Sequence, residues 1–229
     1  MSSGGSSNVD RLYNEFSNEN PEMVNESAAQ AKVSVCHVQA PPISPNTVGL
    51  QGSAILYKLA EGVFTIATNN RVIPITDTNF LINTVFTFEG LGPIKLSEEE
   101  IKFCTTNKDL DATVIELTEA SVKRLQQFGA KFIRVTTTRG SDKMALAQYP
   151  EEELYIDKEA IQEIKENEVY YYLGGALGSN GSPILLWDYK AIGIHKQSAT
   201  SIEHRALLPI HNINSLLAMA MFRLTVSRY

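Results

Sequence analysis

The sequence predicts an all-β fold, with two six-stranded antiparallel β-barrels, a helix that connects them and a second helix at the C-terminus. About a dozen short segments are rich in β-branched and aromatic residues, and turn residues separate them. One segment in the middle of the chain and one near its end have apolar residues at helical spacing instead. Many short strands with few helices are typical of barrels, so we expect this architecture.

The predicted strands form two groups, one on each side of the connecting helix. The first group is interrupted early by residues 40–45, where three prolines favour an extended chain over a helix. The segments of the first group are residues 32–38, 52–59, 62–68, 81–88, 101–104 and 113–117. The segments of the second group are residues 131–136, 144–148, 153–156, 169–173, 183–186 and 191–195.

The connecting helix is predicted over residues 118–128, because Val122, Leu125 and Phe128 recur at helical spacing and Gly129 provides a stop. This amphipathic pattern, bounded by a glycine, indicates a helix that packs one face against a barrel.

The two ends of the chain differ in composition. Residues 208–222 are apolar at helical spacing and are predicted to form the C-terminal helix. Residues 1–30 are rich in Ser, Asn, Glu and Gly and poor in large apolar side chains, which predicts disorder. We therefore expect a disordered segment, residues 1–30, followed by one double-barrel domain, residues 31–229.

Composition disfavours several classes of partner. The chain has 229 residues, 43% of them hydrophobic, and a net charge of −6, so a nucleic-acid binder with a basic face is not expected. No apolar run approaches the ~18 residues of a membrane span, and the N-terminus has no apolar signal-peptide core. Two cysteines are too few for a disulfide framework, so we expect an intracellular protein, cytoplasmic or nuclear.

Three segments carry the most specific information. The first contains Gly-Ser-Ala-Ile-Leu at 52–56, followed by Thr-Asn-Asn-Arg-Val-Ile at 68–73. The second is Asp-Ala-Thr-Val-Ile-Glu-Leu at 111–117. The third is Gly-Ser-Asn-Gly-Ser-Pro at 178–183, followed by Gly-Ile-His-Lys at 193–196. In this order, they resemble the trypsin-like (chymotrypsin-fold) serine peptidases, particularly the intracellular branch without disulfides.

The resemblance covers residues 50–222 and implies a role for each matching position. Arg71 occupies the place of the histidine base, Asp111 that of the aspartate and Asn180 that of the serine nucleophile. Gly178 falls at the oxyanion hole. The cleft and its specificity pocket are assigned to Gly174, Gly175, Gly193 and His195.

The chemistry at these positions differs from that of a protease. A guanidinium has a pKa above about 12 and offers no lone pair at neutral pH, so Arg71 cannot act as the base. Asn180 has no hydroxyl to deprotonate. A buried carboxylate without a partner is costly, so we expect Arg71 to pair with Asp111 through two parallel N–H donors.

The resemblance therefore implies a catalytically inactive pseudoprotease, without a cofactor, that acts as a protein-binding or scaffold module. The old substrate cleft could accept a protein or peptide by β-augmentation. One alternative is a weakly active or unconventional serine endopeptidase that uses Ser179 or Ser182 with His195, which otherwise is a structural histidine. An artificially inactivated protease and an unrelated β-rich domain would also be compatible with the sequence.

Overall fold

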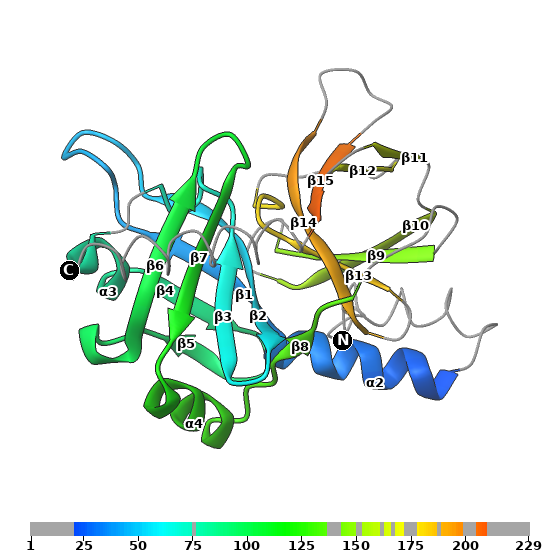
Figure 1. The fold of residues 1–229 in the computed structure, drawn as a ribbon, viewed down its shortest axis with the longest axis horizontal. Helices are drawn as coiled ribbons and strands as arrows, with labels where there is room; N and C mark the ends of the chain where they lie inside the picture. Colours follow the sequence, from blue (N-terminus) through cyan, green and yellow to red (C-terminus); the bar gives the residue numbers. More distant parts are fainter. Residues whose placement is uncertain are drawn as a thin grey trace, which may run out of the picture.

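Two β-sheets lie side by side in the computed structural model of the chain (Figure 1). In this view, one helix lies below the first sheet and a longer helix lies below the second. The structure describes residues 21–74, 77–136, 143–149, 153–160, 163–165, 168–171, 178–186, 189–198 and 205–209.

The first sheet is antiparallel apart from one short strand. Its strands pair in the order β5-β4-β1-β2-β3-β7-β6, and β8 pairs parallel with β2. The strands are β1 (Val35–Ala40), β2 (Leu50–Ala60), β3 (Val63–Thr68), β4 (Val85–Phe88), β5 (Gly92–Ile94), β6 (Ile101–Asn107), β7 (Ala112–Leu117) and β8 (Ile133–Arg134).

The second sheet is antiparallel, with its strands in the order β10-β9-β13-β14-β15-β12-β11. They are β9 (Lys143–Gln148), β10 (Tyr155–Ala160), β11 (Glu163–Lys165), β12 (Glu168–Tyr171), β13 (Pro183–Leu186), β14 (Ala191–Ser198) and β15 (Arg205–Pro209). The predicted two-barrel architecture is confirmed, although the described sheets contain eight and seven strands rather than six each.

Two of the additional strands show why the prediction missed them. Strand β5 has three residues and contains Pro93, which sequence patterns count against a strand. Proline is tolerated there because β5 lies at the end of the sheet order and pairs with β4 alone. Strand β15 ends at Pro209, inside the predicted C-terminal helix, so that helix cannot begin at residue 208. Its remaining residues, 210–222, lie outside the described residues.

The connecting helix is confirmed as α4 (Glu119–Gln127). Thr118 caps it, since its hydroxyl accepts a hydrogen bond from the Ser121 amide at 3.3 Å. Gly129 follows with a φ of 104°, the left-handed conformation that ends a helix. In the described part of the chain, no helix is long and apolar enough to cross a membrane.

Two further α-helices among the described residues were not predicted. Helix α2 (Pro21–Ser34) overlaps the end of the segment predicted to be disordered and replaces the start of the strand predicted at residue 32. The short helix α3 (Thr78–Ile82) replaces the start of the strand predicted at residue 81. The Asp77 carboxylate accepts from the Phe80 amide at 3.2 Å and caps α3, a local signal that the apolar pattern concealed.

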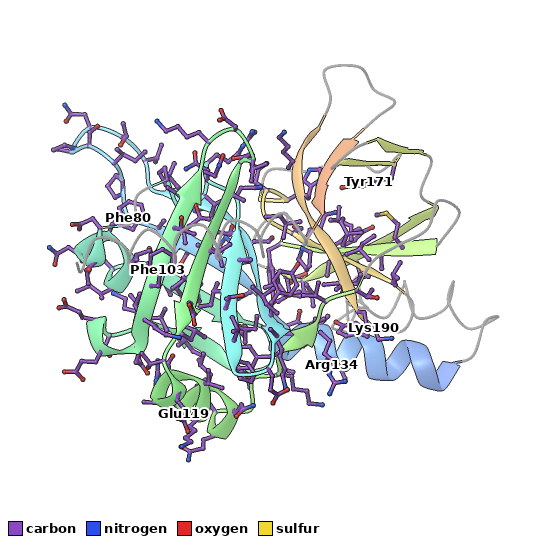
Figure 2. All side chains as sticks on the ribbon, viewed as in Figure 1. Phe80, Phe103, Glu119, Arg134, Tyr171 and Lys190 are labelled. Atoms are coloured by element: carbon purple, nitrogen blue, oxygen red, sulfur yellow. The ribbon has the colours of Figure 1, made fainter. Side chains whose placement is uncertain are left out.

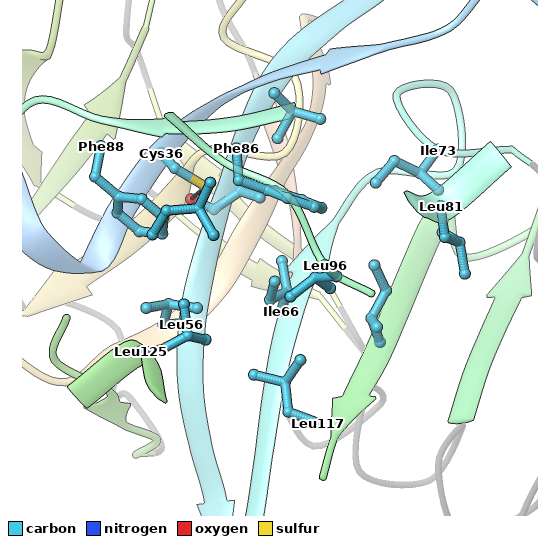
Figure 3. Packing of buried hydrophobic residues seen from close by; sticks show 14 of the residues in the cluster. Cys36, Leu56, Ile66, Ile73, Leu81, Phe86, Phe88, Leu96, Leu117 and Leu125 are labelled. Atoms are coloured by element: carbon cyan, nitrogen blue, oxygen red, sulfur yellow. Dashed lines mark hydrogen bonds between the residues drawn. The ribbon is translucent and has the colours of Figure 1, made fainter. Parts of the chain in front are cut away.

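Apolar side chains fill the first sheet and the junction between the sheets. Leu56, Ile66 and Phe86 belong to the cluster inside the first sheet, which α4 closes with Leu125 (Figure 3). A second cluster joins side chains of both sheets, including Tyr57, Val114, Leu185 and Ile194. All six residues of β7 are buried, because its alternate side chains face the two clusters. Asp111 directly precedes this strand.

Candidate functional site

Arg71 lies in a turn directly after β3. The Val72 and Ile73 amides both donate to the Asn69 carbonyl at 3.1 Å, which closes the turn. The Asn69 side chain is fully buried and its amide donates to the Asp111 carbonyl at 2.8 Å. A single asparagine therefore determines both the shape of the turn and its distance from the start of β7.

Hydroxyl groups of the neighbouring strands hold the same turn from its other side. The Thr113 hydroxyl donates to the Ile73 carbonyl at 2.6 Å and lies 2.7 Å from the Thr106 hydroxyl. The Asn70 amide in turn donates to the Thr106 hydroxyl at 2.6 Å. These bonds attach the turn to β6 and β7, so the backbone of Arg71 has little freedom.

Asp111 has an unusual backbone conformation for a residue with a side chain. Its φ is 49°, in the left-handed region, which aspartate tolerates better than most residues. Its amide donates to the Lys108 carbonyl at 3.1 Å, so a tight turn produces this conformation. The turn directs the Asp111 side chain, which is only 8% exposed, toward Arg71.

Arg71 and Asp111 form the predicted ion pair. The Arg71 Nε lies 2.8 Å from Asp111 Oδ2, and the Arg71 backbone amide donates to Oδ1 at 3.2 Å. The pairing is confirmed, and the Arg71 backbone amide supplies a further donor to the same carboxylate. The Arg71 side chain is 42% exposed, so water screens one partner of the pair while the other is buried.

The Asp111 carboxyl experiences opposing influences. Burial raises its pKa, whereas the charge and hydrogen bonds of Arg71 lower it, and burial has the larger effect. The charge of Lys196 also lowers the pKa of this carboxyl. Sequence reasoning did not assign Lys196 to the site, although it belongs to the Gly-Ile-His-Lys segment that carried the resemblance.

The segment with Asn180 forms a tight loop ahead of β13. Gly178 and Gly181 have φ values of 94° and 81°, and the Ser182 amide donates to the Ser179 carbonyl at 3.2 Å. A Cβ on Gly181 would lie 2.2 Å from the Ser53 carbonyl oxygen and 2.3 Å from the Thr68 hydroxyl. Because the loop lies directly on the first sheet, only glycine fits this position.

The same contact brings the two halves of the candidate site together. A Cβ on Gly181 would lie 3.1 Å from the backbone nitrogen of Asn69, in the turn that carries Arg71. The Ser53 amide donates to the Asn180 carbonyl at 2.8 Å. The predicted triad positions Arg71, Asp111 and Asn180 therefore gather at the junction of the sheets.

His195 is buried in β14 as part of the second sheet. Its Nδ1 lies 2.5 Å from the Tyr171 hydroxyl, and the two rings meet edge to face (Tyr171 is labelled in Figure 2). Its backbone amide donates to the Ser182 carbonyl at 2.7 Å. The Ser182 hydroxyl is fully buried and makes no hydrogen bond within the described structure, so these two residues share a backbone bond only.

The remaining predicted cleft residues are placed in part. Gly193 lies in β14, and its carbonyl accepts from the Tyr57 hydroxyl at 3.1 Å, a bond between the two sheets. Gly174 and Gly175 lie outside the described residues. No three His, Cys, Asp or Glu side chains converge among the residues that the structure covers.

The two cysteines do not provide a replacement nucleophile. Burial raises the pKa of the Cys36 thiol and raises that of Cys104 to about 12. A thiol reacts through its thiolate, which is scarce at neutral pH at such pKa values.

Comparison with solved structures places this geometry in a known fold. The chain is similar to the active form of the Rv3671c protease from M. tuberculosis, with 13% identity and a TM-score of 0.65, covering 87% of this chain and 86% of that one. The inactive form of that protease gives 12% identity, a TM-score of 0.61 and coverage of 88% and 96%.

A serine endoprotease from Yersinia pestis is also similar, with 13% identity and a TM-score of 0.64, over 85% of this chain and 65% of that one. No protein-family model and no curated protein matches the sequence. The chain has the fold of the chymotrypsin-like serine proteases, and at these identities the likeness extends to the fold alone.

Proposed function

We propose that this chain is a pseudoprotease that binds protein or peptide segments instead of cleaving them. The observation that carries the proposal is the contact of 2.8 Å between Arg71 Nε and Asp111 Oδ2. In a serine protease, an imidazole contacts the buried aspartate and shuttles the proton of the nucleophile. Here a permanently protonated guanidinium makes that contact, which leaves the position without a base.

The surroundings of Asn180 support the same conclusion. Neighbouring serines are poor substitutes for a nucleophile, because Ser179 and Ser182 are both buried. The partner that a substitute serine would need, His195, directs its Nδ1 to Tyr171 at 2.5 Å. Loss of the serine or the histidine of a triad lowers turnover by a factor of about 10⁶.

A binding role makes use of the parts that remain. The loop at residues 178–182 keeps a compact shape on the first sheet, and β6 ends the order of that sheet next to the turn before Asp111. An extended peptide that adds to a strand edge gains main-chain hydrogen bonds without any catalytic group. The ligand class that we propose is therefore an extended segment of another protein.

A second candidate is a weakly active serine endopeptidase. It is supported by the likeness to the active form of the Rv3671c protease, because active enzymes share this fold. Under this alternative, a serine other than the residue at position 180 would attack the substrate.

A serine-reactive fluorophosphonate probe tests both candidates on the full chain. We expect no labelling of the unmodified protein, of Asn180→Ser or of Arg71→His, since each lacks a base or a nucleophile. The double variant should label, because it restores serine and histidine beside Asp111. Stoichiometric labelling of the unmodified chain would contradict the proposal, and mapping the label by mass spectrometry would identify the serine.

A further inference from the structure

Ser53, in β2, uses every polar group it has at the junction of the sheets. Its amide donates to the Asn180 carbonyl at 2.8 Å and its carbonyl accepts from the Thr68 hydroxyl at 2.7 Å. Its hydroxyl donates to the Gly178 carbonyl at 3.0 Å and accepts from the Tyr149 amide at 3.0 Å. The hydroxyl thus fills one donor and one acceptor role, which is its full complement apart from a second lone pair.

Three of these four bonds reach residues that follow the connecting helix in the sequence. Ser53 and Gly178 are 125 positions apart, and Ser53 and Tyr149 are 96 apart. Ser53 is completely buried, so water cannot replace any partner that its hydroxyl loses.

Tyr149 strengthens the same junction from the second sheet. It follows β9, and its hydroxyl accepts from the Glu89 amide at 3.2 Å and donates to the Val35 carbonyl at 3.3 Å. Its backbone and its side chain both bind the first sheet, and the Ser53 hydroxyl lies between its backbone and the loop.

We infer that Ser53 is a positioning residue that holds the loop at residues 178–182 in a preformed shape. The loop then requires neither cleavage of the chain nor a bound partner to adopt the conformation seen here. This inference rests on the proposed function only for the use of the loop as part of a binding surface, and its geometric content is independent of that proposal.

Hydrogen exchange resolved by NMR tests the inference, with Ser34→Ala as a matched control. Ser34 is also fully buried, but its hydroxyl makes no hydrogen bond within the described structure. In Ser53→Ala, exchange at the amides of Tyr149 and Gly181 should accelerate about tenfold, because a buried bond is lost. Exchange in the ladder between β3 and β7, at Ile66 and Ile115, should stay unchanged.

Two readouts separate positioning from general destabilisation. The Tyr149 amide proton should shift upfield in folded Ser53→Ala, since its acceptor is gone, and should not move in Ser34→Ala. Equal exchange profiles for the two variants, or uniform acceleration that includes Ile66, would overturn the inference.

A labelling experiment connects the inference to the proposed function. In the Arg71→His/Asn180→Ser background, adding Ser53→Ala should slow fluorophosphonate labelling about tenfold, whereas adding Ser34→Ala should not. If that background does not label at all, the proposed function is challenged, while the exchange data still decide the role of Ser53. Equal labelling rates with and without the Ser53 hydroxyl would count against positioning.

Discussion

The two halves of the candidate site are held by different kinds of interaction. On one side, a charged pair joins Arg71, which is half exposed, to the buried carboxylate of Asp111. On the other side, neutral hydrogen bonds join Ser53 to Thr68 and to the loop at residues 178–182. Ser53 and Thr68 are both buried. Salt and water weaken the first kind, whereas burial protects the second. The neutral half should therefore contribute more to stability than the charged half.

The largest expected effect is that of Gly181→Ala. Its φ of 81° strains any side chain, and the new Cβ would lie 2.2 Å from a backbone oxygen that cannot rotate away. We expect a loss of about 3–4 kcal/mol in the free energy of unfolding, measured by urea denaturation. Gly62→Ala is the matched control, because Gly62 has a φ of 71° and nothing within 4 Å, so only strain of about 1 kcal/mol applies. Equal losses in the two variants would show that the loop does not press on the first sheet.

An intermediate effect is expected from Thr68→Val. The change keeps the shape of the side chain but removes the hydroxyl that donates to the Ser53 carbonyl, which should lower the free energy of unfolding by about 1–2 kcal/mol.

Thr65→Val provides the comparison on the same strand. Thr65 is fully buried, and its hydroxyl makes no hydrogen bond within the described structure, so its removal should be neutral or stabilising. A larger loss of unfolding free energy for Thr65→Val than for Thr68→Val would show that the hydrogen bond between Thr68 and Ser53 does not provide the expected stability at the junction.

The smallest effect is expected at the charged pair, and it depends on pH. Arg71→Met removes the cation that lowers the pKa of Asp111, so the pKa of this buried carboxyl, already raised, should rise further. A raised carboxyl pKa means that ionisation of the group destabilises the folded state, so its penalty is absent below about pH 4 and develops as pH rises.

Arg71→Met should therefore match the unmodified protein near pH 3.5 and lose about 1 kcal/mol by pH 7, in urea unfolding at each pH. Asp111→Asn is the companion variant. It removes the carboxyl whose raised pKa penalises the folded state, so its free energy of unfolding, relative to that of the unmodified protein, should rise rather than fall between pH 3.5 and pH 7. A constant difference between Arg71→Met and the unmodified protein at all pH values would exclude Asp111 as the titrating group.

Sequence reasoning succeeded where local signals were sufficient. The helix α4 follows from its cap at Thr118, its apolar spacing and Gly129, all within a dozen or so residues. The pairing of Arg71 with Asp111 was not local: it was expected from the resemblance, which placed both residues at triad positions, together with the charge that a buried carboxylate requires. Predictions were wrong where a local pattern conflicted with the local capping or with the sheet, as at α3 and β5.

The sequence by itself determined the class of fold, the positions of most strands and the chemical identity of the residues at the predicted triad positions. Strand periodicity and side-chain chemistry are properties of short segments, which explains this success. Only the tertiary structure decided that the side chain and the backbone amide of Arg71 both contact the Asp111 carboxylate. It also decided that Ser53 joins β2 to a loop 125 positions away. Such contacts depend on how two sheets dock, and the hydrogen bonds of a buried serine cannot be assigned before its distant partners are in place.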